Sequence, residues 1–215
     1  RGTVGGGKYS KIERYSMMRK WLIVLVLLMG SLQMFAGEEK NDSGENRELV
    51  YKVDIKDEIG PSIWRLVKRS FDRATDENAD VILVHMNTYG GMVVYADSLR
   101  SLILNYPKPV WVFIDNNAAS AGALISIACD RIYMREGANI GAATVVNQTG
   151  DAMPDKYQSY MRSMIRATAQ AHGKDTVMEN GQSVIRWKRD PRIAEAMVDE
   201  RVVVEGVTDS GKVVT

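Results

Sequence analysis

The sequence predicts an α/β fold with largely parallel strands and flanking helices. Apolar runs of strand length alternate along the chain with stretches in which apolar residues recur every three or four positions. One run, Ala79 to Met86, is nearly continuous in apolar residues, which is typical of a strand covered on both faces. Turns rich in small residues follow this run and the run at 110–114. Ligand sites in such folds lie at the carboxyl ends of the strands, so we expect the two turns to lie side by side there.

Four segments are expected along the 215 residues. Residues 1–16 are Gly-rich and basic, and we interpret them as a cloning or upstream-translation remnant. Residues 17–36 combine a basic pair, a short apolar run and small residues, which is the pattern of a signal peptide. The run is shorter than the roughly 20 apolar residues of a membrane span, and an uncleaved anchor is the alternative. Residues 37–48 predict a polar linker, and residues 49–215 predict one folded domain whose C-terminal part is missing.

The expected elements follow from apolar periodicity and from turn residues. Alternating or continuous apolar runs predict strands at 49–55, 79–86, 110–114, 131–134 and 201–204. Apolar residues at helical spacing predict helices at 61–75, 92–105, 121–128, 156–172 and 191–198. Pro61 suits the first turn of its helix, and Pro107 ends the helix before it. Residues 174–190 are polar and irregular, and we assign no element to them.

Charge argues against a nucleic-acid partner. The whole chain carries a formal net charge of +1, but six of its 28 bases and only one of its 27 acids lie in residues 1–36. The remainder therefore holds 22 bases and 26 acids, a net charge of −4. This is not the basic footprint of a nucleic-acid-binding domain. The single cysteine, Cys129, lies in an apolar helical pattern, so we expect a buried free thiol and a fold stabilised by packing alone.

A serine stands in the second of the two turns, within Asn116-Asn117-Ala118-Ala119-Ser120-Ala121-Gly122-Ala123. Its neighbours are too small to shield it, and it lies between a predicted strand and a predicted helix. On such a turn the serine oxygen is exposed beyond the strand end, near the unpaired N–H groups of the helix, as a nucleophile requires. The alternative is a tightly packed corner in which Ser120 only caps the helix.

A nucleophilic serine needs a base, and the chain offers few candidates. It holds two histidines. His172 would lie about 24 Å along the predicted helix from Lys156, so these two cannot share a site. His85, on a strand, is more typical of a cleft or core residue, and a Ser-His-Asp triad is poorly supported. Lys156 begins a helix near Met153 and Tyr157 and could act as the base if it were partly desolvated; the alternative is a solvated lysine.

Acyl transfer also needs N–H donors for the oxyanion. The natural suppliers are Gly90, Gly91 and the N–H of Ala121, directly after the serine. A glycine pair is weak evidence alone, but here it is followed by a serine in a small-residue corner and then by a lysine. We expect no metal site, because no cluster of His, Cys, Asp or Glu has ligand spacing, and we expect no cofactor.

With these residues in place, the chain resembles the ClpP-class serine peptidases, and within them the NfeD family of membrane-bound serine proteases. The resemblance runs from about Tyr51 to Val204. Its landmarks are Asn87-Thr88-Tyr89-Gly90-Gly91, Ala118-Ala119-Ser120-Ala121-Gly122, Gly141-Ala142-Ala143, Lys156, Arg189-Asp190-Pro191 and Ala194-Glu195-Ala196-Met197-Val198.

The resemblance implies a ClpP/crotonase-like fold, with Ser120 as nucleophile, Lys156 as general base, and Gly90, Gly91 and Ala121 as oxyanion donors. It also implies cleavage of apolar stretches in membrane proteins, with stomatin-like proteins as partners. We expect an exported protein at the periplasmic face of the inner membrane that forms a homodimer or a higher homo-oligomer. Members of the family usually continue into membrane spans and a small β-barrel domain.

Two departures from the family pattern bear on the site. Tyr89 stands where members often have proline before the glycine pair. The histidine that ClpP uses some 25 residues past its serine has no counterpart, since residues 143–147 contain none. Two other functions stay open: a non-catalytic scaffold that binds a membrane partner through its cleft, and a crotonase-type acyl-CoA enzyme, against which the predicted export argues.

Overall fold

The computed structural model describes residues 48–179, 181–204, 208–209 and 212–213. The predicted remnant, signal peptide and nearly all of the linker lie outside the described residues. The strands are β1 Val50–Ile55, β2 Val81–Thr88, β3 Val110–Ala119, β4 Arg131–Met134, β5 Asn139–Gly141, β6 Lys174–Glu179, β7 Gln182–Trp187, β8 Thr208–Asp209 and β9 Lys212–Val213. The helices are α2 Pro61–Asp76, α3 Val93–Leu104, α4 Ala121–Ala128, α5 Asp155–Ala171 and α6 Pro191–Ala196.

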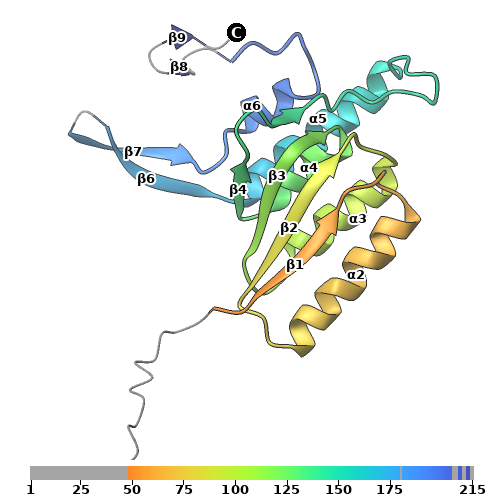
Figure 1. The fold of residues 1–215 in the computed structure, drawn as a ribbon. Coiled ribbons are helices and arrows are strands. Elements are labelled where there is room, and N and C mark those ends of the chain that lie inside the picture. The colour runs from red at the N-terminus through yellow and green to blue at the C-terminus, as the bar shows by residue number, and fades with distance from the viewer. Residues whose placement is uncertain (1–47, 180, 205–207, 210–211, 214–215) are drawn as a thin grey trace, which may run out of the picture. The chain divides into compact units, whose positions relative to one another are not determined.

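A parallel sheet forms the centre of the domain (Figure 1). Its strand order is β1-β2-β3-β4, and β5 pairs with the later part of β3. Every pairing within this sheet is parallel. Strands β1, β2 and β3 are joined in turn through helices α2 and α3, the crossover connection that parallel neighbours require. The α/β class with largely parallel strands and flanking helices, predicted from the sequence, is therefore confirmed.

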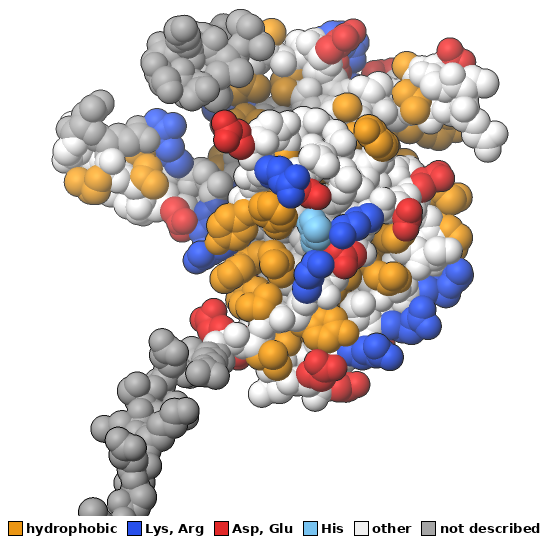
Figure 2. Space-filling view, viewed as in Figure 1, with side chains coloured by type: hydrophobic (Ala, Val, Ile, Leu, Met, Phe, Trp, Pro, Cys, Tyr) orange, Lys and Arg blue, Asp and Glu red, His pale blue; other side chains and the backbone are white. Residues whose placement is uncertain are grey.

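One face of the sheet packs against the helices. Along β1, β2 and β3, alternate side chains are fully buried and point toward the helices, and α2 turns one apolar stripe to them. Helix α4 is buried at all eight of its residues, which explains why its sequence is apolar all round. Figure 2 shows the other face of the sheet, where hydrophobic side chains lie beside charged ones. Residues Leu83, Trp111 and Phe113 on that face are half-buried, so full cover of both faces was a wrong expectation.

Several elements differ from the prediction. Strand β3 continues past Ile114 to Ala119, because residues 117–119 pair with β5, a partner that lies 22 residues further along the chain. Residues 174–187, to which no element was assigned, form the antiparallel hairpin of β6 and β7. The expected strand at 201–204 is absent, because Asp199 accepts hydrogen bonds from the backbone and side chain of Arg201 and turns the chain there.

Candidate active site

Ser120 lies between the end of β3 and the start of α4. Its backbone has φ 53° and ψ −114°, a region that residues with a side chain rarely adopt. Two groups of backbone bonds hold it there: its N–H donates to the carbonyl of Gly141 (2.8 Å), and its own carbonyl accepts from Ala123 (3.0 Å) and Leu124 (3.4 Å). The side chain does not cap the helix. A strained serine between a strand and a helix is the arrangement that exposes a nucleophilic hydroxyl.

The glycine turn after β2 packs directly against this serine. A methyl group on Gly90 would lie 2.7 Å from Cβ of Ser120 and 3.2 Å from its Oγ, so only glycine leaves room for the serine side chain. Gly91 is equally constrained, since a methyl group there would lie 2.3 Å from the carbonyl oxygen of Ile59. Both glycines have positive φ, 116° and 150°. The two turns that the sequence placed at the same edge of the sheet are therefore in contact.

The backbone N–H groups near Ser120 differ in whether they already donate a hydrogen bond within the protein. The N–H of Gly90 donates to Oγ1 of Thr88 (3.1 Å). Among the described residues, none accepts a hydrogen bond from the N–H of Gly91 or of Ala121. Ala121 is the first residue of α4, whose N-terminal N–H groups lack partners within the helix. Unpaired N–H groups at this position are available to a developing oxyanion.

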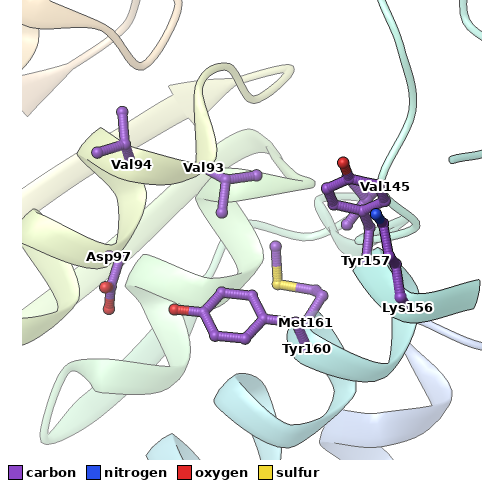
Figure 3. Close-up of a pocket in the computed structure, with 8 residues that line it drawn as sticks. All are labelled: Val93, Val94, Asp97, Val145, Lys156, Tyr157, Tyr160 and Met161. Atoms are coloured by element: carbon purple, nitrogen blue, oxygen red, sulfur yellow. The ribbon is translucent and has the colours of Figure 1, made fainter. Parts of the chain in front are cut away.

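Lys156 lies in the first turn of α5 and lines a cavity of about 570 Å³ between α3 and α5 (Figure 3). Its side chain is exposed, and Nζ lies 4.9 Å from the ring centroid of Tyr157. Figure 3 shows these two side chains together at one end of the cavity and Tyr160 reaching toward Asp97 at the other. The lining is mostly apolar and consists of Val93, Val94, Asp97, Val145, Lys156, Tyr157, Tyr160 and Met161.

The structure brings together Ser120, Gly90, Gly91 and Ala121, but it does not pair the serine with the lysine. Ser120 is not among the residues that line the cavity of Lys156, and no hydrogen bond joins Oγ of Ser120 to Nζ of Lys156. Lys156 instead makes a cation–π contact with the ring of Tyr157.

The two histidines lie in separate environments, and neither bonds to Ser120. His85, on β2, has Nδ1 2.9 Å from Asp54 and Nε2 3.5 Å from Asp115. Burial acts against ionisation of Asp54, but its hydrogen bonds to Lys52, Lys56 and His85 together lower the pKa of that carboxyl. His172 follows α5 and has Nε2 2.8 Å from the carbonyl oxygen of Ile127, near the end of α4. Burial, and then the charge of Arg189, lower the pKa of His172.

Several residues at the site were missed by sequence reasoning alone. Thr88 and Gly141 stood within quoted motifs without an assigned role. Val93 and Val94 were not singled out, although they are apolar residues at the start of a helix that fall outside its buried positions, Ala96, Leu99 and Ile103. Apolar side chains on a helix that lie outside its buried face are the signal that indicates a surface groove.

Within the described part of the chain, no group of His, Cys, Asp or Glu side chains could hold a metal ion. Within the same residues, none of the helices has both the length and the apolar character to span a bilayer.

The fold belongs to the ClpP/crotonase-like α/β class, and Ser120 lies at one of its strand-to-helix junctions. The structure superposes with a TM-score of 0.60 on the 1510-N membrane-bound stomatin-specific protease, solved as a mutant with a substrate peptide. That match has 24% identity and covers 72% of this chain and 67% of the other. A profile of the family described as NfeD1b, N-terminal domain, matches residues 49–215. The chain belongs to the NfeD1b N-terminal domain family.

Two curated relatives also match. Membrane protein NfeD1b of Bacillus subtilis (strain 168) is 32% identical over 177 residues, which is 82% of this chain and 35% of the relative. Membrane-bound protease PH1510 of Pyrococcus horikoshii is 27% identical over 143 residues, which is 61% of this chain and 32% of the relative. The chain thus spans about a third of the length of these relatives.

Proposed function

We propose that the chain is a serine endopeptidase in which Ser120 is the nucleophile and Lys156 the general base. The observation that carries the proposal is the conformation of Ser120, which has positive φ at a strand-to-helix junction and packs against a glycine turn. Strained backbone conformations of this kind cluster at active sites. The names of the matched structures add support, because a lysine-to-alanine and a serine-to-alanine mutant of the stomatin-specific protease have been solved.

In the proposed reaction, Oγ of Ser120 bonds to the carbonyl carbon of the scissile peptide while its proton passes to the neutral amine of Lys156. The N–H groups of Gly91 and Ala121 hold the oxyanion that forms. The C–N bond then breaks, and Lys156 returns the proton to the leaving amine. Water hydrolyses the acyl-enzyme by the same steps, with Lys156 again taking and returning one proton. Gly90, whose N–H is bonded to Thr88, leaves room for the serine.

This reaction requires Lys156 to leave Tyr157 and approach Ser120 when substrate binds. An apolar segment in the cavity would exclude water from around Nζ and so favour the neutral amine. The same segment would cover Tyr157, which is 41% exposed, and Tyr160, which is 59% exposed. Substrate binding therefore supplies both the desolvation and the displacement that the exposed lysine lacks. Catalytic contacts that are long without substrate and tighten in its presence are common in enzymes.

The apolar cavity supports apolar segments of membrane-associated proteins as substrates, and stomatin-like proteins are the partners we propose. A matched protease is named as specific for stomatin, and the relatives are named as membrane proteins. We further propose that the complete protein acts at the periplasmic face of the inner membrane, as a homodimer or a higher homo-oligomer.

A specific observation favours a second function, a catalytically inactive scaffold with the same fold. Lys156 is exposed, is not hydrogen-bonded to Ser120 and already has an aromatic partner. A scaffold would bind an apolar segment in the same cavity without cleaving it.

The deciding experiment is fluorophosphonate labelling of the full chain together with cleavage of an apolar peptide. Ser120→Ala should abolish both labelling and cleavage. Lys156→Ala should lower the rate of cleavage by at least about 100-fold, because removal of a general base costs 10²- to 10⁴-fold.

Matched controls exist for both residues. Lys174 is also an exposed lysine over an aromatic ring, 4.3 Å from the centroid of Trp187, and Lys174→Ala should leave cleavage unchanged. Ser159 is an exposed serine on α5, and Ser159→Ala should leave labelling unchanged. Absence of labelling and cleavage in the wild type, with peptide binding that survives Ser120→Ala, would favour the scaffold.

A further inference from the structure

Both the hydroxyl and the methyl group of Thr88, the last residue of β2, make contacts at the site. It is 2% exposed. Its Oγ1 accepts a hydrogen bond from the N–H of Gly90 (3.1 Å) and donates one to the carbonyl of Asp57 (2.8 Å). The hydroxyl therefore joins the glycine turn to the loop that precedes α2. The N–H of Gly90 is buried, so without this acceptor it would be an unsatisfied buried donor.

The methyl group of Thr88 contacts the start of the nucleophile helix. A Cβ on Gly122 would lie 2.8 Å from Cγ2 of Thr88, so Gly122 is the residue that lets α4 approach the end of β2. Gly122 is the second residue after Ser120. One side chain thus contacts the glycine turn through its hydroxyl and the helix of the serine through its methyl group.

The glycine turn is attached on its far side by the backbone of Ile59. The N–H of Ile59 donates to the carbonyl of Gly90 (2.8 Å), and its carbonyl accepts from Met92 (2.8 Å). The first of these bonds holds the Gly90–Gly91 peptide, which carries the N–H of Gly91. The threonine hydroxyl holds the preceding Tyr89–Gly90 peptide and also lies 3.4 Å from the Gly90 carbonyl oxygen. Loss of this hydroxyl would leave the Gly90–Gly91 peptide held by Ile59 alone, and the N–H of Gly91 would be less firmly oriented.

We propose that Thr88 is a positioning residue, which sets the distance and direction of the Gly91 N–H relative to Ser120. The inference rests on the proposed function, since it assigns to the Gly91 N–H the role of an oxyanion donor. Thr88 touches neither substrate nor reacting atoms and acts only through Gly90 and Gly122. The hydroxyl orients the glycine turn, and the methyl group adds a packing contact with Gly122.

Two substitutions separate the hydroxyl from the methyl group. Thr88→Val keeps the shape and the contact with Gly122 but removes the acceptor for Gly90, whereas Thr88→Ser keeps the acceptor and removes the methyl group. Rates are measured on the full chain and divided by the amount of Ser120 that a fluorophosphonate titrates. Loss of folded protein then does not lower the rate per active serine. For Thr88→Val we expect kcat to fall about 10- to 100-fold with KM within about twofold, as for small displacements of catalytic groups. Thr88→Ser should stay within about threefold of the wild-type kcat. An unchanged kcat per titrated serine in Thr88→Val would overturn the proposal.

A second measurement does not depend on activity. Hydrogen exchange of the Gly90 amide, followed by NMR, should be about 100-fold faster in Thr88→Val than in the wild type and in Thr88→Ser, because its acceptor is lost. If the wild type neither labels nor cleaves, the proposed function fails, and the exchange rates still test whether Thr88 orients the turn. Equal Gly90 exchange in all three proteins would contradict that orientation.

Discussion

At the scale of single residues, the site is built from positions where only one side-chain size fits. Gly90 must lack a side chain because Ser120 occupies the space, and Gly91 because the backbone of Ile59 does. Ser120 has the opposite property, since it carries a side chain in a backbone conformation that favours glycine. The free energy that holds Ser120 there comes from its neighbours, chiefly the backbone bonds to Gly141, Ala123 and Leu124.

Substitution of Gly91 by alanine should therefore disturb the fold and not only the chemistry. The added methyl group would lie 2.3 Å from the Ile59 oxygen, which is backbone and cannot rotate away. We expect Gly91→Ala to lower the free energy of unfolding by at least about 3 kcal/mol, in the range of severe backbone and packing defects. Urea denaturation monitored by circular dichroism measures this change in the free energy of unfolding.

Gly150 provides the matched control, because it also has positive φ (89°) but no atom within 4 Å of an added Cβ. Gly150→Ala should cost only the conformational strain, about 1 kcal/mol. Equal effects of the two substitutions would mean that the contact with Ile59 is not what requires glycine at position 91.

Sequence reasoning reached the residues that lie on the two turns, because each turn follows its strand directly in the sequence. It could not reach the acceptor of the Ser120 N–H, since Gly141 is brought there by a three-residue strand that no local pattern marks. It also could not decide whether Lys156 meets Ser120. That distance depends on the loop between β5 and α5 and on side-chain rotamers, neither of which is encoded in residue spacing.

At the scale of elements, helix α4 is held at both ends. Ser120 lies at its start, and at its other end the side chains of Arg189 and His172 meet the carbonyl of Ile127. Arg189 also bonds to the carbonyl of Ser126 (3.4 Å). A cation near a helix C-terminus is favourable, and here it links α4 to the chain between β7 and α6.

The histidine in this cap should make stability depend on pH. Burial and the charge of Arg189 lower the pKa of His172 from the ordinary value of 6.5, so the folded protein favours the neutral ring. The contribution of this group is fully present above pH 6.5 and is lost as the pH falls toward the folded-state pKa. We expect the free energy of unfolding of the wild type to decrease between pH 7 and pH 5, measured by urea denaturation at each pH.

His172→Gln keeps a donor for the Ile127 carbonyl but cannot gain a proton. The decrease between pH 7 and pH 5 should therefore be smaller in this variant than in the wild type. The same decrease in both proteins would show that another group is responsible.

Most elements could be predicted, because strands and helices around a parallel sheet have strong local periodicity. The β6–β7 hairpin was missed although the sequence carries its signal, the dipeptide Asn180-Gly181 between two β-branched stretches. Polar residues on both faces of the hairpin hid the alternation, and Met178 and Ile185 are about 70% exposed. The short β5 has no local signal, because it exists only as a partner of β3.

At the scale of the whole molecule, the domain has no internal disulfide. Its single cysteine, Cys129, directly follows α4 and is fully buried, and burial raises the pKa of its thiol to about 12. The thiolate is the reactive form of cysteine, so this thiol should react only when the domain opens.

Alkylation of Cys129 by iodoacetamide at pH 8 should therefore be at least about 100-fold slower in the native protein than in the urea-unfolded chain, since exchange of a core group requires global opening. Mass spectrometry gives the labelled fraction with time. Ser159→Cys adds an exposed cysteine on α5 as an internal reference that should react at once. Labelling of Cys129 at the rate of that reference would mean that the end of α4 opens without global unfolding.

Strand β3 pairs with β4 through residues 111–114 and then with β5 through residues 117–119. The Ser120 N–H thus depends on the register of β5, and one inserted residue between Arg135 and Asn139 would exchange Gly141 for a neighbour and reverse the faces of that strand. The loop that follows is tied at both ends, because Ala143 donates a hydrogen bond to Met197 (2.7 Å) and Met153 donates one to Val145 (2.9 Å). Insertions and deletions between the proposed serine and lysine are therefore expected only between Val145 and Met153, where they would leave the position of Lys156 unchanged.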